Sequence, residues 1–399
     1  MTPETYKAPR PVVSSIRTTD AAVCDGLLPE SFPEPVRLDV SWEAFWTSPL
    51  PFYTLGSDGE GNVFIGGFGR DFLGPGNERA QVYTRAGSPL GVLEIANVAS
   101  TPVAIAPLAS GFLTSYLTPD GCELRRYDLE LHLVGVGPCE LMEYVGGTPP
   151  TAARKRGGFF VHPDGSSIEI LVAEQTGEIM SRFITAAGEL QREHKIGTTL
   201  PSSSASTKFR IHIVAQLDAR ERLLVSWGGV NSFLYFPFRR PALGRWLDPQ
   251  AVPIGDEFVI AEKSPVTDMQ RLLGDGIALQ LADDLNHYSL FVHSGETRTL
   301  PAPYWLTGQP FRRYSRVRSG KAYLAGIPQL SSSEPERFEL IASDGTSCGY
   351  IQFEEPGGAC DGGGFAIGLD GTVIRASRRT LRVGDGRSTA VFWWPALLR

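Results

Sequence analysis

The hydrophobic residues of this chain fall in short runs separated by polar or glycine-containing turns, and almost no segment has the spacing of an amphipathic helix. The clearest example extends from Phe52 to Ile95, where apolar runs such as Val63–Gly67 alternate with turns such as Asp58–Asn62. Glycines allow such turns because they adopt backbone conformations that other residues avoid. We therefore expect this region to form four strands of one antiparallel sheet.

Units of the same kind recur downstream at a spacing of roughly fifty residues, and seven can be counted along the chain. A single sheet leaves its faces exposed, whereas sheets packed radially around an axis cover one another and leave only short edges. The pattern predicts an all-β fold, a β-propeller of seven four-stranded blades, with six or eight blades still open. A stack of sandwich domains would need linkers about every hundred residues. The low-complexity stretches 201–206 and 330–336 do not lie at such boundaries.

The two ends of the chain have different expected roles. Residues 1–35 contain six prolines and little periodicity, which predicts an extended arm that lies on the ring or reaches a partner. Residues 36–399 are then a single propeller domain. Propeller rings close by pairing strands from both chain ends, and Val36–Val40 is the candidate early strand. The aromatic run Phe392–Trp394 is expected in the core of the closing blade.

The segment from Asp58 to Gly67, followed by Val82–Gly87, resembles the repeat of bacterial β-propeller families of the NHL and SBBP type. In those families an Asp-x-x-Gly-Asn turn precedes an aliphatic strand, and a later strand ends in a turn before glycine. One unit, about a tenth of the chain, matches this repeat. The other units keep the Asp-Gly turns but lose the asparagine and the spacing. The resemblance implies the propeller fold, and such families serve as binding platforms more often than as enzymes.

Charge and composition narrow the class of function. The 399 residues include 37 basic and 44 acidic side chains, a net charge of −7, so binding to nucleic acid by bulk charge is disfavoured. No apolar run reaches the roughly 18 residues that span a bilayer, and no secretory leader is recognisable. Beginning at Met1, the chain is expected in the cytoplasm. If the natural protein carries a leader that is cleaved on export, the expected location is instead secreted or periplasmic.

Five cysteines are too few for a disulfide-stapled scaffold, and the odd number leaves at least one without an internal partner. Free thiols are the default expectation, because the cytoplasm is reducing. In an oxidising compartment two pairs would bridge, Cys122 with Cys139 and Cys348 with Cys360, because each pair brackets a short hairpin-like stretch. A zinc site is unsupported, because the sequence contains no C-x-x-C motif.

Local catalytic motifs such as G-x-S-x-G, H-E-x-x-H and the phosphate-binding G-x-x-x-x-G-K-[ST] are absent from the sequence. Of the six histidines, His162 and His287 are the catalytic candidates, because each lies near a loop with acidic residues. Asp283, Asp284 and Asn286 carry the oxygen ligands that Ca²⁺ prefers. Turn chemistry explains the same residues without a metal, and the sequence predicts no cofactor.

A basic and aromatic segment lies between residues 305 and 318. Arginine binds carboxylates and phosphates through paired hydrogen bonds, and aromatic residues together with arginine are enriched at protein interfaces. The alternative is a solvated strand edge, where charge discourages pairing with other strands. The candidate partner-binding residues are Trp305, Arg312, Arg313, Tyr314, Arg316 and Arg318.

Two hypotheses of function follow. The first is a non-enzymatic propeller that serves as an interaction platform and binds a protein partner or a larger assembly through its rim or channel face. The alternative is a propeller hydrolase or lyase with a metal or a histidine at the axis. The two differ in whether His162, His287 and the pair Asp283 and Asp284 meet in one pocket.

Overall fold

The computed structural model describes residues 10–14, 21–27, 33–42, 52–68, 77–96, 101–139, 154–173, 176–199, 213–228, 241–272, 276–303, 306, 314–316, 322–327, 337–354, 365–368, 370–383 and 386–398. Strands dominate these residues, and the helix found among them is the four-residue α1 (Ala21–Cys24). Within the same residues, no helix has the length and hydropathy needed to cross a bilayer.

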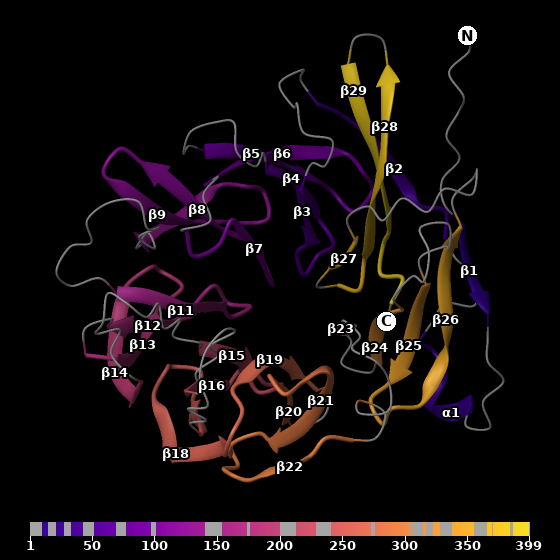
Figure 1. Ribbon diagram of the computed structural model, residues 1–399. Helices are drawn as coiled ribbons and strands as arrows, with labels where there is room; N and C mark the ends of the chain where they lie inside the picture. The colour runs from indigo at the N-terminus through magenta and orange to yellow at the C-terminus, as the bar shows by residue number, and fades with distance from the viewer. Residues whose placement is uncertain are drawn as a thin grey trace.

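Seven small antiparallel sheets form a ring, so the protein is a seven-bladed β-propeller, as the sequence pattern predicted (Figure 1). The first strands of neighbouring blades contact one another, which places them at the centre of the ring and the last strands at the rim. Blade 1 comprises β3 (Phe52–Ser57), β4 (Val63–Phe68), β5 (Asn77–Tyr83) and β6 (Pro89–Ala96). Blade 2 comprises β7 (Ile105–Leu108), β8 (Gly111–Thr118), β9 (Gly121–Tyr127) and β10 (Leu133–Cys139). Blade 3 comprises β11 (Arg154–Val161), β12 (Ser167–Ala173), β13 (Glu178–Ile184) and β14 (Leu190–Thr198).

The remaining four blades complete the ring. Blade 4 comprises β15 (Ile213–Leu217), β16 (Leu223–Gly228), β17 (Ala242–Leu247) and β18 (Pro253–Ala261), and blade 5 comprises β19 (Val266–Arg271), β20 (Gly276–Leu281), β21 (Asp284–His293) and β22 (Thr299–Pro301). Blade 6 comprises β23 (Tyr314–Arg316), β24 (Ala322–Ile327), β25 (Arg337–Ala342), β26 (Ser347–Glu354) and β1 (Arg10–Ser14). Blade 7 comprises β27 (Phe365–Ile367), β28 (Val373–Val383), β29 (Gly386–Trp394) and β2 (Val36–Trp42).

One five-residue hairpin turn recurs around the ring and explains many of the aspartates in the sequence. The N–H of residue 1 donates to the carbonyl of residue 5, and the N–H of residue 4 donates to the carbonyl of residue 1. In four of these turns residue 1 is an aspartate whose Oδ1 accepts the N–H groups of residues 3 and 5, which is the hydrogen bonding of an Asx turn. These aspartates are Asp58, Asp128, Asp218 and Asp248.

The core lies in the seams between blades, where clusters of buried side chains join blade 3 to blade 4, blade 4 to blade 5, and blade 7 to blade 1. Side chains from third strands also donate hydrogen bonds to the carbonyls of turns in the next blade. These directional bonds orient the neighbouring blades in addition to the burial of apolar side chains between them. The bonds run from Trp393 to Arg85 (3.0 Å), Arg126 to Ala186 (3.3 Å), Ser181 to Ala251 (2.8 Å) and Trp246 to Glu296 (2.8 Å).

An N-terminal strand closes the ring. β2 pairs antiparallel with β29 over its whole length, from Val36 opposite Trp393 to Trp42 opposite Arg387. This confirms the early strand predicted at Val36–Val40. Residues 392–394 are fully buried in the same blade, which confirms the expectation that the terminal aromatic run is core.

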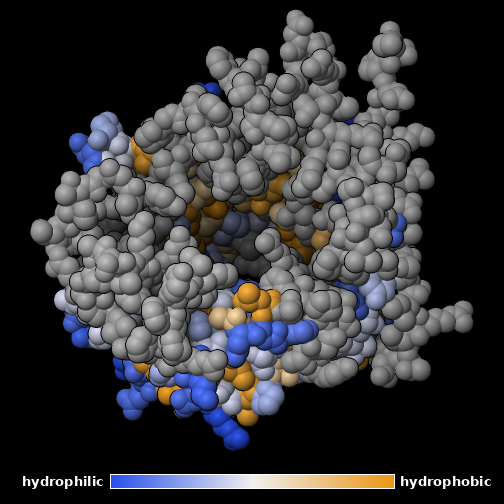
Figure 2. Space-filling model, viewed as in Figure 1, coloured by the Kyte–Doolittle hydropathy of each residue, from blue (hydrophilic) through white to orange (hydrophobic). Residues whose placement is uncertain are grey.

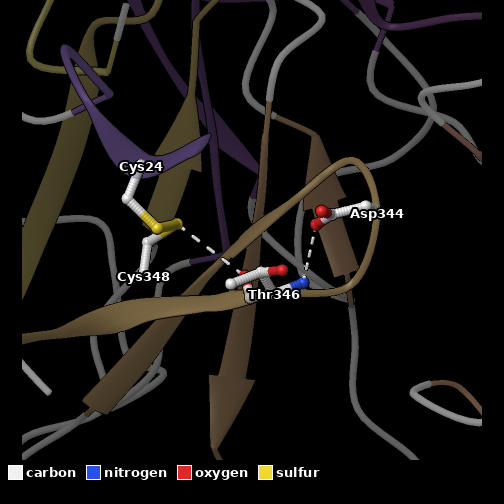
Figure 3. Close-up of a disulfide and its surroundings, with 4 residues drawn as sticks. All are labelled: Cys24, Asp344, Thr346 and Cys348. Carbon is white, nitrogen blue, oxygen red and sulfur yellow. Dashed lines mark hydrogen bonds between the residues drawn. A yellow bond between two sulfur atoms is a disulfide. The ribbon is translucent and has the colours of Figure 1, made fainter. Parts of the chain in front are cut away.

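The first described residues of the N-terminal arm lie on blade 6. β1 pairs antiparallel with β26, from Arg10 opposite Glu354 to Ser14 opposite Tyr350, and adds a fifth strand to a blade that already has four. Past α1, Leu27 is buried in the cluster that joins blades 6 and 7. Cys24 forms a disulfide with Cys348 of β26, just beyond the end of the β1 pairing (Figure 3).

The structure corrects the expected state of the cysteines. Cys122 and Cys139 lie directly opposite each other on β9 and β10 and form the disulfide that was one of the two candidate pairs. Cys348 bonds Cys24 rather than Cys360, because the arm runs along the edge of β26 and brings the Cα atoms of Cys24 and Cys348 to 5.4 Å. The default expectation of free thiols is therefore wrong for four of the five cysteines. Cys360 lies outside the described residues.

Candidate functional site on blades 5 and 6

The two faces of the ring are built differently. Turns after first and third strands lie on one face, which we call the short-turn face; the first turns of blades 1 and 2 touch there through a hydrogen bond from Gly59 N–H to Leu108 O (3.2 Å). The opposite face, which we call the long-connection face, receives the segments after second and fourth strands. The described strand ends on this face include Cys139, Thr198, Gly228 and Pro301. Variable surface segments on a rigid scaffold commonly carry binding sites.

The centre of the ring is hollowed, and the described walls of this hollow are largely apolar (Figure 2). The first strands explain this character, because runs such as Ile105–Leu108 and Ile213–Leu217 contain few charged residues. Other first strands do carry charged residues, for example Asp268 and Arg271 in β19.

Blade 5 carries a local irregularity at the long-connection face. Leu281 pairs with Asp284, but its neighbour Gln280 pairs with Tyr288, so residues 285–287 have no counterpart on β20 and form a bulge. Bulges re-aim side chains and are frequent beside functional sites.

A buried amide holds this bulge in place. Gln280 is only 6% exposed, its Oε1 accepts a hydrogen bond from Thr267 Oγ1 (3.0 Å), and its Nε2 donates to the carbonyl of Leu285 (2.8 Å). Leu285 itself is 52% exposed at the tip. The protein thus uses a buried polar network to fix an exposed leucine, and such networks rigidify the segment that they bond.

The same bulge orients a histidine against an aspartate. Nδ1 of His287 lies 3.0 Å from Oδ1 and 3.3 Å from Oδ2 of Asp284, and both side chains are partly exposed. A carboxylate on Nδ1 fixes the orientation of the imidazole and leaves Nε2 for another group. Asp283 is exposed next to this pair, and its N–H donates to Ser264 Oγ (3.2 Å). The side chain of Asn286 lies outside the described part of the chain.

The basic and aromatic segment starts beside this pair. The N–H of Ala302 donates to the carbonyl of Ser289 (3.1 Å), two residues from His287. Leu306, which is 1% exposed, packs in a cluster with Tyr288 of blade 5 and Tyr323 of blade 6. The described residues Ala302 and Leu306, which precede the candidate arginines along the chain, therefore lie at the seam of blades 5 and 6.

The candidate partner-binding residues themselves are only partly described. The backbones of Tyr314 and Arg316 form the ends of β23, opposite Ala325 and Tyr323. Their side chains, and the residues Trp305, Arg312, Arg313 and Arg318, lie outside what the structure describes.

His162 is not part of this site. It occupies the first position of the turn between β11 and β12, on the short-turn face, whereas His287, Asp283 and Asp284 lie at the long-connection face of blade 5. The structure therefore brings His287 and Asp284 together and places His162 on the opposite face of the ring. His162 instead lies near Glu221 of blade 4.

Within the described residues, one group of three has donor atoms close enough to share a metal ion: Asp128, Glu130 and His132 in the turn between β9 and β10. Turn chemistry accounts for the closeness of these three residues, because Oδ1 of Asp128 accepts hydrogen bonds from the backbone N–H groups of Glu130 and His132. Desolvation raises the pKa of Asp128, but the hydrogen bonds from the His132 backbone and ring together outweigh it and lower that pKa below its ordinary value. The group lies at the rim, away from Asp283 and Asp284.

Comparison with known proteins adds little beyond the fold. No family model matches this chain and no curated protein matches its sequence, so the resemblance to NHL and SBBP repeats stays a prediction. The chain is similar to the solved structures of the polysaccharide lyase Uly1 (10% identity, 91% of this chain and 100% of that one, TM-score 0.44). It is also similar to a candidate 6-phosphogluconolactonase from Bacteroides fragilis NCTC 9343 (13% identity, 79% of this chain and 88% of that one, TM-score 0.42). A prolyl endopeptidase is similar as well (14% identity, 89% of this chain and 55% of that one, TM-score 0.43). At these values the likeness carries no argument about function.

Sequence reasoning found part of this site and missed the rest. It singled out His287 and Asp284 from their proximity along the chain, but not Gln280 or Leu306, which hold the bulge and the segment in place. One signal was available for Gln280, because it is the polar residue in the apolar run Ile277–Leu281. Leu306 gives no such signal, because one leucine in a long connection is not distinctive.

Proposed function

We propose that the protein is an interaction platform that binds a protein partner at the seam of blades 5 and 6 on the long-connection face. The observation that carries the proposal is the bulge at residues 285–287, where buried hydrogen bonds fix an exposed leucine beside a histidine–aspartate pair. An exposed apolar side chain on a backbone that is already fixed loses little conformational entropy when a partner covers it, which favours binding. The arginines of residues 312–318 fit a partner with an acidic segment.

Replacing Arg312, Arg313 and Arg316 together by alanine should weaken partner capture at least tenfold, since the hydrogen bonds and charge offered to an acidic segment are lost. The melting temperature should stay within a few degrees, because surface substitutions are typically near-neutral. The measurement is a titration of the purified partner, identified by pull-down from the native host, against both proteins.

A matched variant controls for the change in charge. Three arginines are exposed: Arg85 of blade 1, Arg192 of blade 3, and Arg298, which lies on the short-turn face of blade 5. Replacing these three by alanine removes the same charge and should leave capture unchanged. Equal losses in the two variants, or no loss in either, would remove the arginine segment from the proposal.

The histidine–aspartate pair also favours a second candidate function, a hydrolase or lyase in which His287 is the general base. Asp284 would hold the imidazole by Nδ1 and leave Nε2 to take a proton, which is the arrangement of a base and its orienting group. This function would replace the platform if the purified protein turned over a substrate and His287→Asn abolished that turnover.

We also propose that the protein works in an oxidising compartment, as a secreted or periplasmic protein. Two disulfides support this, because structural disulfides are rare in a reducing cytoplasm. One of them ties the N-terminal arm to blade 6, far along the chain.

A further inference from the structure

Two residues of the short-turn face depart from the repeated turn, and the first is His162. In the corresponding turns of blades 1 and 4, residue 1 is Asp58 or Asp218, which caps the backbone. In blade 3 this position holds His162, and Asp164 supplies the cap instead, accepting hydrogen bonds from Ser166 N–H (2.8 Å) and Oγ (2.7 Å). The imidazole of His162 is therefore not needed to form its own turn.

The second departure is Glu221, at residue 4 of the equivalent turn in blade 4. Its φ is 63°, a left-handed conformation, whereas blades 1, 3 and 7 place Gly61, Gly165 and Gly371 at this position. Glycine adopts this conformation without strain and glutamate does not. Leu131 and Ala251 occupy the same position in the turns after β9 and β17, with φ of 64° and 63°, so the turn accepts other residues as well. Glu221 differs from them in placing a carboxylate beside blade 3.

The two departures meet across the seam of blades 3 and 4. Nδ1 of His162 lies 3.3 Å from Oε2 of Glu221; the histidine side chain is 3% exposed and the glutamate side chain 43%. Neither ring nitrogen of His162 has a hydrogen bond to the groups that the structure describes. A buried imidazole at ion-pair distance from a carboxylate responds to protonation, since the pair attracts strongly only when the ring is charged.

The surrounding charges favour the same response. Asp164, in the turn of His162, is the second carboxylate near the ring. Burial raises its pKa, but hydrogen bonds from Ser166 and the charges of His162 and Arg126 outweigh this and lower that pKa below its ordinary value. Asp218 of blade 4 is buried, and its Oδ2 lies 2.9 Å from Arg222 Nε, so the charges of these two side chains largely cancel. Two carboxylates thus lie near the imidazole, and Arg126 of blade 2 is a cation close to Asp164.

We propose that His162 and Glu221 form a pH-dependent latch between blades 3 and 4. The latch is closed when the imidazole is protonated, and it opens when the ring loses its proton. Acidification therefore tightens this seam on the short-turn face, independently of any partner bound at blades 5 and 6.

Hydrogen exchange of the two turns tests the latch in the full chain. The amides of Gly165 and Glu221 donate to the carbonyls of His162 and Asp218 within the turns, and they report local opening. After correction for intrinsic exchange rates, their protection should be about three- to tenfold higher at pH 5 than at pH 8, because the charged ring attracts Glu221 only at the lower pH. The turn between β13 and β14, in which the N–H of Gly188 donates to the carbonyl of Thr185, has neither a histidine nor an aspartate and should show no such change.

Two variants distinguish the latch from general effects of pH. Replacing His162 by aspartate and Glu221 by glycine restores the residues of the repeat, so the ring should fold and both amides should be equally protected at the two pH values. Glu221→Gln keeps the size of the side chain and removes its charge, and should reduce the difference, while Asp164 remains near the ring. A pH effect that survives in the double variant, one that Glu221→Gln leaves undiminished, or its absence from the unmodified protein overturns the proposal.

Discussion

Replacing Cys24 and Cys348 by serine should lower the free energy of unfolding by about 3–5 kcal/mol. The disulfide joins residues 324 positions apart, so in the unfolded chain it closes a loop of most of the protein and removes the corresponding loop-closure entropy, which grows with loop length. The stability is measured by guanidinium unfolding of both proteins. Cys360→Ser is included in each so that no unpaired thiol exchanges with the disulfides.

The second disulfide provides the matched control. Cys122 and Cys139 are 17 positions apart, so removing this bond should cost less, about 3 kcal/mol in the chain-entropy relation. The local effects should differ as well, because loss of the first disulfide should raise hydrogen exchange in β1 and β26. A larger cost for the short loop, or no cost for the long one, would contradict the described path of the arm.

Trp393→Ala should cost about 3–5 kcal/mol, the usual range for removing a large buried aromatic side chain. Trp393 is fully buried, packs in the cluster that joins blade 7 to blade 1, and its ring centroid lies 6.3 Å from that of Tyr83. Because this seam joins the two ends of the ring, the cavity weakens closure as well as local packing. Thermal and guanidinium unfolding measure the loss.

Trp393→Phe separates packing from hydrogen bonding. It keeps an aromatic ring but removes the bond from Nε1 to Arg85 O, which should cost about 1 kcal/mol, plus a term for the smaller ring. Trp246→Phe removes the equivalent bond to Glu296 in the seam of blades 4 and 5 and should cost a similar amount. If Trp393→Ala were nearly neutral, this seam would not be closed as described.

The architecture was predictable because its signals are local. Aspartate and glycine in the repeated turn, together with short apolar runs, mark hairpins whatever their position in the chain. Blade 5 shows the limit, since only the strands at Ile277–Leu281 and Tyr288–Val292 were recognisable. The blade also contains β19, with Asp268 and Gln270 among its residues, and the three-residue β22, and neither has an apolar run to detect.

The long-range features were not predictable from the sequence. Val36–Val40 was identified as the closing strand because propellers pair their two ends, but β1 has no such precedent and its place on blade 6 is set by tertiary contact alone. The bond of Cys24 to Cys348 follows from that placement, and cysteine spacing favoured a nearer partner. In the candidate site, His287 and Asp284 are close in sequence, whereas Leu306 joins them only through packing against Tyr288.

The closed ring is tested most directly by cross-linking β2 to β29. Ser41 and Ser388 lie directly opposite each other in the pairing. In a Cys360→Ser background, Ser41→Cys with Ser388→Cys should form a disulfide in most molecules, detected by mass spectrometry of the joined peptides. Ser41→Cys with Thr389→Cys, shifted by one residue, should form little. Absence of the first bond, or equal yields from the two pairs, would contradict a propeller closed by its N-terminal strand.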